Sequence, residues 1–336
     1  MNILLTSAGR RSYLVNYFKE VIGTTGKVHA SNSEWSTALE VADKAVISPL
    51  IYNGNYIDFL VGYCKENNIT IIISLFDIDL PVLAQNKQRF KDEGINVVVS
   101  DYEVTQICND KWKTYEFLVE NGILAPKSFI DLSEAQMAIK MGDLNYPLIL
   151  KPRWGMGSMS IFKVENDEEL AVLYRKVQRE VQESYLKYES QLNPERAVII
   201  QEFINGQEYG LDIINDLNKN YVTTFIKQKT AMRSGETDGA TTIENKMLEQ
   251  VGKKIAENLR HIANLDTDCF LIDEKIYILE MNCRFGGGYP FSHLAGANLP
   301  SAILKWLEQK DGKASLKDYR VGVEGMKMIN LTEVVS

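Results

Sequence analysis

The first hundred residues most constrain the fold, because short apolar runs alternate there with helical patterns. The runs occupy residues 3–5, 45–47, 69–73 and 95–99. Between the first two runs, apolar side chains recur at helical spacing at Tyr13, Leu14, Tyr17, Phe18 and Val21. Strands that alternate with helices predict a parallel, doubly wound α/β sheet.

Ligands of such sheets collect beyond the carboxyl ends of the strands. These ends fall here at residues 7–11, 31–33 and 75–79. None is a dinucleotide fingerprint, since T-S-A-G-R-R follows the first run where GxGxxG would be needed, and a dehydrogenase is disfavoured. Arg10 and Arg11 could instead hold a carboxylate or a phosphate. Asp77 and Asp79 could bind a substrate amine, although helix capping is at least as plausible for them.

The remainder of the chain predicts an α+β region. Asp110 is the expected N-cap of a helix that stops at Asn121 and Gly122. Strands are then expected at residues 147–151, 160–164, 197–201, 209–214, 221–227, 269–272 and 275–281. Further helices are expected at residues 168–190 and 300–307.

Composition excludes several functional classes. The 336 residues exceed the roughly 250 to 300 that one core supports, so we expect more than one domain. A net charge of −8 disfavours nucleic acid as a partner, because phosphate neutralisation needs clustered Lys and Arg. No segment approaches the roughly 18 apolar residues of a membrane span, and the start lacks the pattern of a signal peptide.

The cysteines and histidines show no metal or disulfide spacing. The cysteines are Cys64, Cys108, Cys269 and Cys283, which stand far apart without a CxxC pair and favour a reducing, cytoplasmic location. His29 and His261 are expected to be structural. His293 follows a glycine-rich segment and is a weaker candidate for chemistry than for packing or capping.

One motif places a lysine at the end of an expected strand, before a glycine-containing loop. It reads L-K-P-R-W-G-M-G-S-M-S over residues 150–160. Glycines let backbone N–H groups approach a phosphate, and Lys151 adds a point charge. Alone, the pattern fits a simple hairpin equally well.

A second motif, V-I-I-Q-E-F-I-N-G-Q-E-Y over residues 198–209, describes a buried strand that turns at Gly206 and returns with an acid. Such a crossing can offer backbone hydrogen bonds to an adenine edge and a carboxylate to ribose hydroxyls. Alone, a plain strand and turn is the simpler interpretation.

A third motif gathers acids near the carboxyl end of the chain. Strand alternation puts Glu280 and Asn282 on one face, and hairpin pairing can set Asp268 opposite them. Carboxylate and amide oxygens are hard ligands that suit Mg²⁺.

The three motifs occur in one chain, and in this combination the sequence resembles the ATP-grasp superfamily from about residue 111 to residue 300. It is most similar to the branch of carbamoyl phosphate synthetase and biotin carboxylase. This similarity is carried by N-D-K at 109–111, R-S-G-E-T-D at 233–238 and E-M-N-C-R-F-G-G-G at 280–288, where the family usually has proline in place of Cys283.

The resemblance implies a fold and a nucleotide site. It implies a Rossmann-like pre-ATP-grasp domain at 1–108, a small ATP-grasp lobe with a linking helix at 109–204, and a large lobe with a tail at 205–336. ATP phosphates would be held by Lys111 and Lys151, with the loop that contains Gly155, Gly157 and Ser158 closing over them. The adenine would face Gln201 and the backbone of Glu202, Phe203 and Ile204, and the ribose would bind Glu208.

The resemblance also implies the chemistry. Asp268, Glu280 and Asn282 would carry Mg²⁺, with two ions expected and Mn²⁺ able to substitute. Arg284, helped by Arg233 and Lys229, would stabilise the transferring phosphoryl group or the acyl phosphate. The implied activity is a carboxylate–amine ligase that forms an acyl phosphate from a small-molecule carboxylate and then an amide with an amine.

Two other activities stay open from the sequence. A small-molecule kinase would use the same MgATP site, and a noncatalytic nucleotide-binding regulator is disfavoured by the complete lysine, acid and asparagine set. Amino acids, a sugar acid or a small dipeptide are all compatible substrates, with bicarbonate less favoured because neither a second ATP-grasp half nor a large carboxyl-terminal domain is expected. A homodimer is the commonest symmetric assembly, although no segment specifies the oligomeric state.

Overall fold

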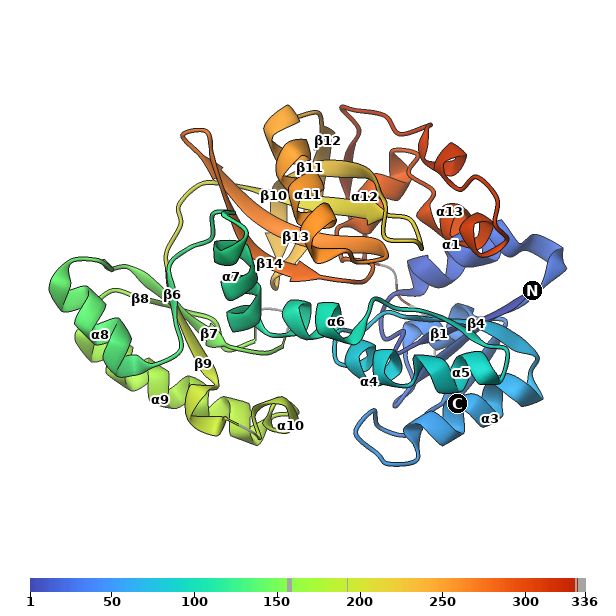
Figure 1. The fold of residues 1–336 in the computed structure, drawn as a ribbon, viewed down its shortest axis with the longest axis horizontal. Helices are drawn as coiled ribbons and strands as arrows, with labels where there is room; N and C mark the ends of the chain where they lie inside the picture. Colours follow the sequence, from blue (N-terminus) through green and yellow to red (C-terminus); the bar gives the residue numbers. More distant parts are fainter. Residues whose placement is uncertain (156–158, 192, 330, 332–336) are drawn as a thin grey trace.

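A computed structural model describes residues 1–155, 159–191, 193–329 and 331 (Figure 1). Its amino-terminal region is a five-stranded parallel sheet ordered β3-β2-β1-β4-β5. The strands are β1 (Asn2–Thr6), β2 (Val28–Asn32), β3 (Lys44–Ile47), β4 (Ile69–Ser74) and β5 (Asn96–Val98). The helices of this region are α1 (Ser12–Ile22), α2 (Thr37–Val41), α3 (Tyr56–Glu66), α4 (Asp79–Gln85) and α5 (Lys87–Asp92). The predicted doubly wound sheet is confirmed.

Two helices lead out of this sheet, α6 (Tyr102–Asn109) and α7 (Lys111–Glu120). Asp110 caps α7, as predicted, by accepting the backbone N–H groups of Trp112 and Lys113. The same carboxylate receives two hydrogen bonds of 2.7 Å from the buried Arg153. The start of α7 is therefore fixed to the strand that carries Lys151.

A small lobe follows, at the left of Figure 1, with an antiparallel sheet ordered β6-β9-β7-β8. Its elements are β6 (Ser128–Phe129), α8 (Leu132–Met141), β7 (Leu148–Pro152), β8 (Phe162–Val164), α9 (Asp167–Glu183), α10 (Lys187–Ser190) and β9 (Val198–Glu202). The single helix expected at residues 168–190 is wrong. Ser184 is extended and its Oγ accepts the N–H of Leu186, so the chain turns there and restarts as α10.

The large lobe is a six-stranded antiparallel sheet ordered β14-β13-β10-β11-β12-β15. Its strands are β10 (Gln207–Asn215), β11 (Tyr221–Arg233), β12 (Glu236–Ile243), β13 (Ala263–Ile272), β14 (Lys275–Asn282) and β15 (Glu324–Met326). Its helices are α11 (Lys246–Leu259), α12 (Tyr289–Leu294) and α13 (Leu299–Leu307). The strand expected at 269–272 is too short, because β13 pairs with β10 along the whole of residues 263–271.

Three single turns of 3₁₀ helix complete the described part of the chain. They are η1 (Gly23–Thr25), η2 (Pro194–Arg196) and η3 (Lys313–Leu316). No helix in the described ranges is both long and apolar enough to cross a bilayer.

The apolar cores show how the parts are joined. Buried residues of the parallel sheet, such as Leu5 and Ile73, belong to one cluster with Phe285 and Tyr289 of the large lobe. In Figure 1, α13 lies against α1, which extends this shared core. The small lobe packs around a cluster drawn from its own elements. The boundaries at residues 108 and 204 stay predictions, but the small lobe is packed as a unit of its own.

Candidate active site

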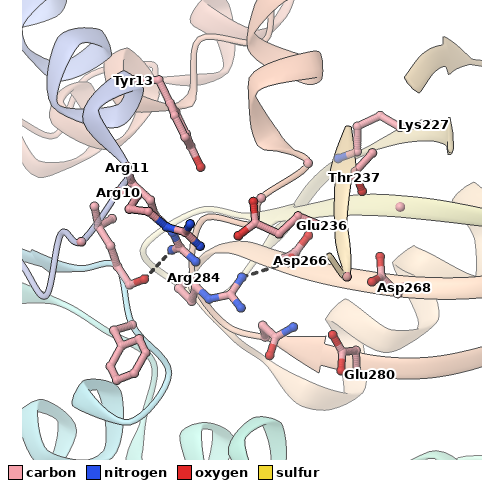
Figure 2. A pocket seen from close by; sticks show the side chains of 18 of the residues that line it. Arg10, Arg11, Tyr13, Lys227, Glu236, Thr237, Asp266, Asp268, Glu280 and Arg284 are labelled. Atoms are coloured by element: carbon pink, nitrogen blue, oxygen red, sulfur yellow. Dashed lines mark hydrogen bonds and ion pairs between the residues drawn. The ribbon is translucent and has the colours of Figure 1, made fainter. Parts of the chain in front are cut away.

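A cavity of about 330 Å³ lies between the parallel sheet and the large lobe (Figure 2). The amino-terminal wall comes from the loops that follow β1 and β4. The facing wall comes from β10 to β14 and from the glycines that follow β14. Two of the three predicted strand ends, at residues 7–11 and 75–79, therefore contribute lining residues, whereas residues 31–33 do not line this cavity.

A second cavity of about 60 Å³ adjoins the first and reaches into the small lobe. Its lining includes Lys111, Lys151, Gly155 and Glu280. Gly235 and Glu280 line both cavities, so the two spaces meet at these residues. The fold thus brings the predicted phosphate-binding lysines to one of the predicted metal ligands.

The acidic residues are arranged by the hairpin of β13 and β14. Asp268 pairs in register with Glu280, and Asp266 pairs with Asn282. A register shift between Asp268 and Cys269 makes this possible, because Cys269 pairs with Ile278 and leaves Leu279 as the extra residue of a bulge. The predicted juxtaposition of Asp268 and Glu280 is present in the structure.

Lys229 of β11 sits among these acids. Its ammonium lies 2.7 Å from Asp268 and 2.6 Å from Glu208. Burial raises the pKa of Asp268 to about 7, with Asp266 and Glu280 adding repulsion and Lys229 opposing the shift. The cluster therefore holds more carboxylate charge than Lys229 alone balances.

Arg284 follows β14 and links the large lobe to the loop after β4. Its guanidinium contacts Asp77 at 2.9 Å and Asp266 at 2.9 Å. Burial lowers the pKa of Arg284, but Asp77 and Asp266 outweigh that effect and raise it, so the side chain stays charged. Gly286 permits the close approach here, since a Cβ on it would meet the Asp266 carboxylate at 2.0 Å. Asp77 thus pairs with an arginine and is not left to bind an amine.

The two lysines of the second cavity are poorly solvated. Burial and, to a smaller extent, the positive charge of Lys111 lower the pKa of Lys151 to about 8. Burial likewise lowers the pKa of Lys111, which Glu280 partly restores. The Lys111 ammonium donates to the carbonyl of Gly155, so it also fixes the start of the glycine loop. Two cations in one low-dielectric space form a site for a polyanion.

The predicted adenine segment lies in and after β9. The Gln201 side chain is buried and its amide nitrogen donates to the Ser128 hydroxyl at 2.9 Å. The Glu202 N–H donates to the Lys127 carbonyl at 2.8 Å, so it is not a donor for an adenine. Neither cavity is lined by Gln201, Glu202, Phe203, Ile204 or Glu208. Their nucleotide contacts stay predictions.

Other predicted site residues lie away from the two cavities or outside the described residues. Arg233 is exposed at the end of β11, where it pairs with Asp238 at 2.5 Å, and it lines neither cavity. Gly157 and Ser158 fall outside the described residues. Asp79 is buried under β1 and accepts hydrogen bonds from the hydroxyls of Thr6, Ser7, Tyr56 and Ser74, so its role is structural.

The histidines are packed, as expected. His293 stacks on Tyr17 with ring centroids 3.6 Å apart, and it contacts the Tyr289 hydroxyl at 3.1 Å. His261 is fully buried against the Ile213 carbonyl, and burial lowers its pKa to about 4. His29 contacts the hydroxyl of Tyr63.

Sequence reasoning missed several residues of the cavity wall, including Tyr13, Lys227, Thr237 and Asp266. Asp266 shares the face of Asp268 by strand alternation and could have been found from that signal. Lys227 is fixed by a buried ion pair with Asp212. Thr237 lies in the R-S-G-E-T-D segment that carried the resemblance but was given no role, and Tyr13 was expected only as an apolar position of a helix.

The acids fit a divalent cation in chemistry. Glu280 and Asp268 face each other in register, and burial, together with repulsion from Asp266 and Glu280, raises the pKa of Asp268. Across the described ranges, no group of three or more His, Cys, Asp or Glu side chains is arranged to hold a metal. The predicted set has two carboxylates and the amide of Asn282, and its role in metal binding stays a prediction.

Two family models match the chain. The model described as PylC-like, N-terminal domain matches residues 3–98, and the model described as ATP-grasp domain matches residues 108–288. The carbamoyl phosphate synthase arginine-specific large chain of Bacillus subtilis (strain 168) is 22% identical over 301 residues, which cover 86% of this chain and 26% of that protein. The chain thus spans about a quarter of the length of the curated relatives it matches first.

Solved structures share the fold. The biotin carboxylase domain of 2-oxoglutarate carboxylase from Hydrogenobacter thermophilus, a dimer solved with MgADP, ADP and bicarbonate, has a TM-score of 0.72 and 16% identity. That match covers 96% of this chain and 73% of the other. An L-amino acid ligase from Bacillus licheniformis has a TM-score of 0.69 and 18% identity, and covers 90% of this chain and 74% of that one.

Proposed function

Because the chain belongs to the ATP-grasp family, as its motifs predicted, we propose that it is an ATP-dependent carboxylate–amine ligase. ATP would phosphorylate the carboxylate of one small molecule, and an amine of another would displace the phosphate to form an amide. ADP and inorganic phosphate would be released. The family match spans more than half of the chain and supports the nucleotide chemistry, whereas the two substrates are our proposal.

One observation carries the proposal. Lys111, Lys151 and Glu280 line the smaller cavity, which meets the larger cavity at Glu280. One wall of the larger cavity comes from the amino-terminal region. A phosphoryl donor at the lysines and an acceptor in the larger cavity would meet at Glu280. Positioning and charge neutralisation supply most of the catalysis in phosphoryl transfer, and this arrangement offers both.

The residues of the chain would act by binding and orienting. Lys111 and Lys151 would bind the phosphates of ATP, and Lys229 would keep Asp268 and Glu208 in place through contacts of 2.7 and 2.6 Å. Arg284 would face the transferring phosphoryl group with its position fixed by Asp77 and Asp266. None of these residues needs to become a covalent nucleophile, because the carboxylate of the substrate attacks phosphorus.

Magnesium fits the same site. Asp268, Glu280 and Asn282 would hold it, and the ion would neutralise charge on the phosphates of ATP. We propose two ions, with Mn²⁺ able to replace Mg²⁺. Removal of divalent ions with a chelator should therefore abolish turnover.

The test is a trapping assay on the full chain. The protein is incubated with MgATP and pooled amino acids, sugar acids or small dipeptides, with and without hydroxylamine, and ADP, phosphate and hydroxamate are measured. We expect a hydroxamate that depends on both ATP and one carboxylate, and reactions with ADP in place of ATP serve as controls. ADP release with a stable phosphorylated product and no hydroxamate would identify a kinase instead.

The assembly and location follow the sequence prediction. We propose that the chain forms a homodimer and lies in the cytoplasm. The biotin carboxylase domain of Hydrogenobacter thermophilus is a dimer, which supports the proposed homodimer. Light scattering on the purified chain would measure a mass of about twice 38.1 kDa. A mass equal to one chain would rule the dimer out.

A further inference from the structure

Arg11 is held by carbonyl groups and not by acids. Its Nη1 donates to the carbonyl of Leu75 and to that of Phe285, the latter at 3.0 Å. No carboxylate within the described residues lies at ion-pair distance from it. The side chain is half-buried and lines the larger cavity, as Figure 2 shows. Asp77 and Asp266 act on its charge only from a distance, without a direct ion pair among the described residues.

A second arginine lies beside it. Arg284 also donates to the Phe285 carbonyl, at 3.2 Å, so the two guanidinium groups share one acceptor. Arg284 is neutralised by Asp77 and Asp266, whereas Arg11 is not. Burial lowers the pKa of Arg11 and the charge of Arg284 lowers it further, and the opposing effects of Tyr13, Asp77 and Asp266 do not reverse the shift. An anion beside Arg11 would relieve both effects.

The charges of the cavity are divided between its walls. The amino-terminal wall contributes Arg10 and Arg11 with no acid, and its other lining residues are Ser7, Ala8, Gly9, Tyr13, Leu75 and Phe76. The acids of the lining, Glu236, Asp266, Asp268 and Glu280, all come from the large lobe. A ligand that spans the cavity would therefore meet cations at the end farther from the predicted magnesium site.

Tyr13 adds a neutral donor at the same end. Its ring lines the cavity, and Figure 2 shows its hydroxyl directed inward, toward Arg11. Burial raises the pKa of Tyr13; Arg11 and Arg284 oppose that shift, Glu236 and Asp266 add to it, and the phenol keeps its proton at neutral pH. Arg11 and Tyr13 together offer the donors that a carboxylate or phosphate group requires.

We propose that Arg11 and Tyr13 bind a second anionic group of the acid substrate, so that the enzyme takes acids with two anionic groups. One group is the carboxylate that is phosphorylated near Glu280 and Arg284, and the other is a carboxylate or a phosphate at Arg11. This inference rests on the proposed function for the identity of the reacting group. A substrate with one carboxylate would leave the Arg11 charge unpaired in the filled cavity.

Measuring how the acids bind tests this inference without requiring that the enzyme turns them over. Calorimetry on the full chain with saturating MgADP would compare acids that differ only in the second group. The carboxylate pairs are succinate with butyrate and glutarate with pentanoate, and the phosphate pairs are phosphoserine with serine and 3-phosphoglycerate with glycerate. We expect one dianionic member to bind about 10- to 100-fold more tightly than its partner, as charge-assisted hydrogen bonds to arginine allow. The pair that shows the preference tells whether the second group is carboxylate or phosphate.

Variants then test whether Arg11 and Tyr13 cause the preference for acids with two anionic groups. Arg11→Gln and Tyr13→Phe should weaken binding of the dianionic acid, Arg11→Gln by about 10- to 100-fold, while MgADP binding stays within twofold. Arg11→Lys keeps a donor for the two carbonyls and reports on folding, and should retain part of the preference. Arg89→Gln is the matched control, because Arg89 is an exposed arginine of the same domain that pairs with Asp58.

The outcomes are distinct from those of the trapping assay. Equal binding of both members of every pair, or a dianion preference that survives in Arg11→Gln, would overturn the inference even if hydroxamate forms. A lost preference in a folded Arg11→Gln chain would support it even if no hydroxamate forms, and the proposed reaction alone would then fail. Weakened MgADP binding in Arg11→Gln would assign Arg11 to the nucleotide and overturn the inference as well.

Discussion

Asp268 and Glu280 lie opposite each other as register partners on β13 and β14, where the chain places a bulge. Glu280 lines both cavities, whereas Asp268 lines only the larger one. Glu280 therefore lies between the cavity that contains Lys111 and Lys151 and the cavity that Arg10 and Arg11 line on the amino-terminal side.

Glu280→Gln should abolish MgATP turnover and leave the fold intact. The change removes one carboxylate charge from the predicted metal site and keeps the size of the side chain. We expect at least an about 100-fold loss in ADP release, comparable to removing one preorganised electrostatic group in other enzymes. Circular dichroism and thermal unfolding should match the parent chain. Full turnover in a folded variant would contradict the metal assignment.

Nucleotide binding should weaken as the pH rises above about 8. The pKa of Lys151 is lowered to about 8, so its ammonium is charged below that pH and is neutral well above it. Because a phosphate favours the charged lysine, binding of ATP above pH 8 should take up a proton. Calorimetry in buffers of different ionisation enthalpy measures this uptake. The Lys151→Arg variant stays charged, so its affinity for ATP should change little between about pH 7 and 9.5. A pH profile identical to that of the parent chain would show that a group other than Lys151 titrates.

Gly155→Ala should weaken ATP binding by about tenfold. Gly155 has φ +96°, and a Cβ there would lie 2.9 Å from Leu186 Cδ2, which also lines the smaller cavity. Gly142→Ala is the control, since Gly142 has φ +79° and no atom within 4 Å of the added Cβ. Both variants should lose about 1 to 2 kcal/mol of stability through backbone strain. Only Gly155→Ala should change the Kd for ATP, and equal Kd values would mean that the loop does not contact the nucleotide.

Asp77→Ala should destabilise the chain through Arg284. The two side chains are buried and their atoms lie 2.9 Å apart, in a contact that joins the loop after β4 to the end of β14. Loss of one partner of a buried pair costs about 3 to 5 kcal/mol, and we expect the lower end because Asp266 still contacts Arg284. Denaturant unfolding measures the change. An unchanged midpoint would show that Asp77 adds no net stability.

The parallel sheet could be predicted because its strands are buried apolar runs. Four of the five strands lie at the runs expected from the sequence. β2 reads V-H-A-S-N and lacks such a run, so only its end was predicted, at residues 31–33. The end of α9 was missed for a local reason, since Ser184 leaves the helical conformation in a stretch whose composition still favours a helix.

The site was predictable in its residue types but not in its geometry. A regular hairpin closed at Ile272 and Lys275 would set Asp268 against Leu279, and only the bulge moves Glu280 into register. The partners of Arg284 come from two distant segments, which strand periodicity does not relate. The same holds for Arg11, whose contact with Phe285 depends on how the amino-terminal sheet packs against the large lobe.

Isotope transfer shows whether the reaction passes through an acyl phosphate. An acid substrate labelled with ¹⁸O in its carboxylate is converted with MgATP and an amine, and the released phosphate is analysed by mass. An acyl phosphate passes one carboxylate oxygen to phosphate when the amine displaces it, so we predict phosphate that carries one ¹⁸O atom. Unlabelled phosphate, with the label retained in the product, would contradict the proposed ligase mechanism.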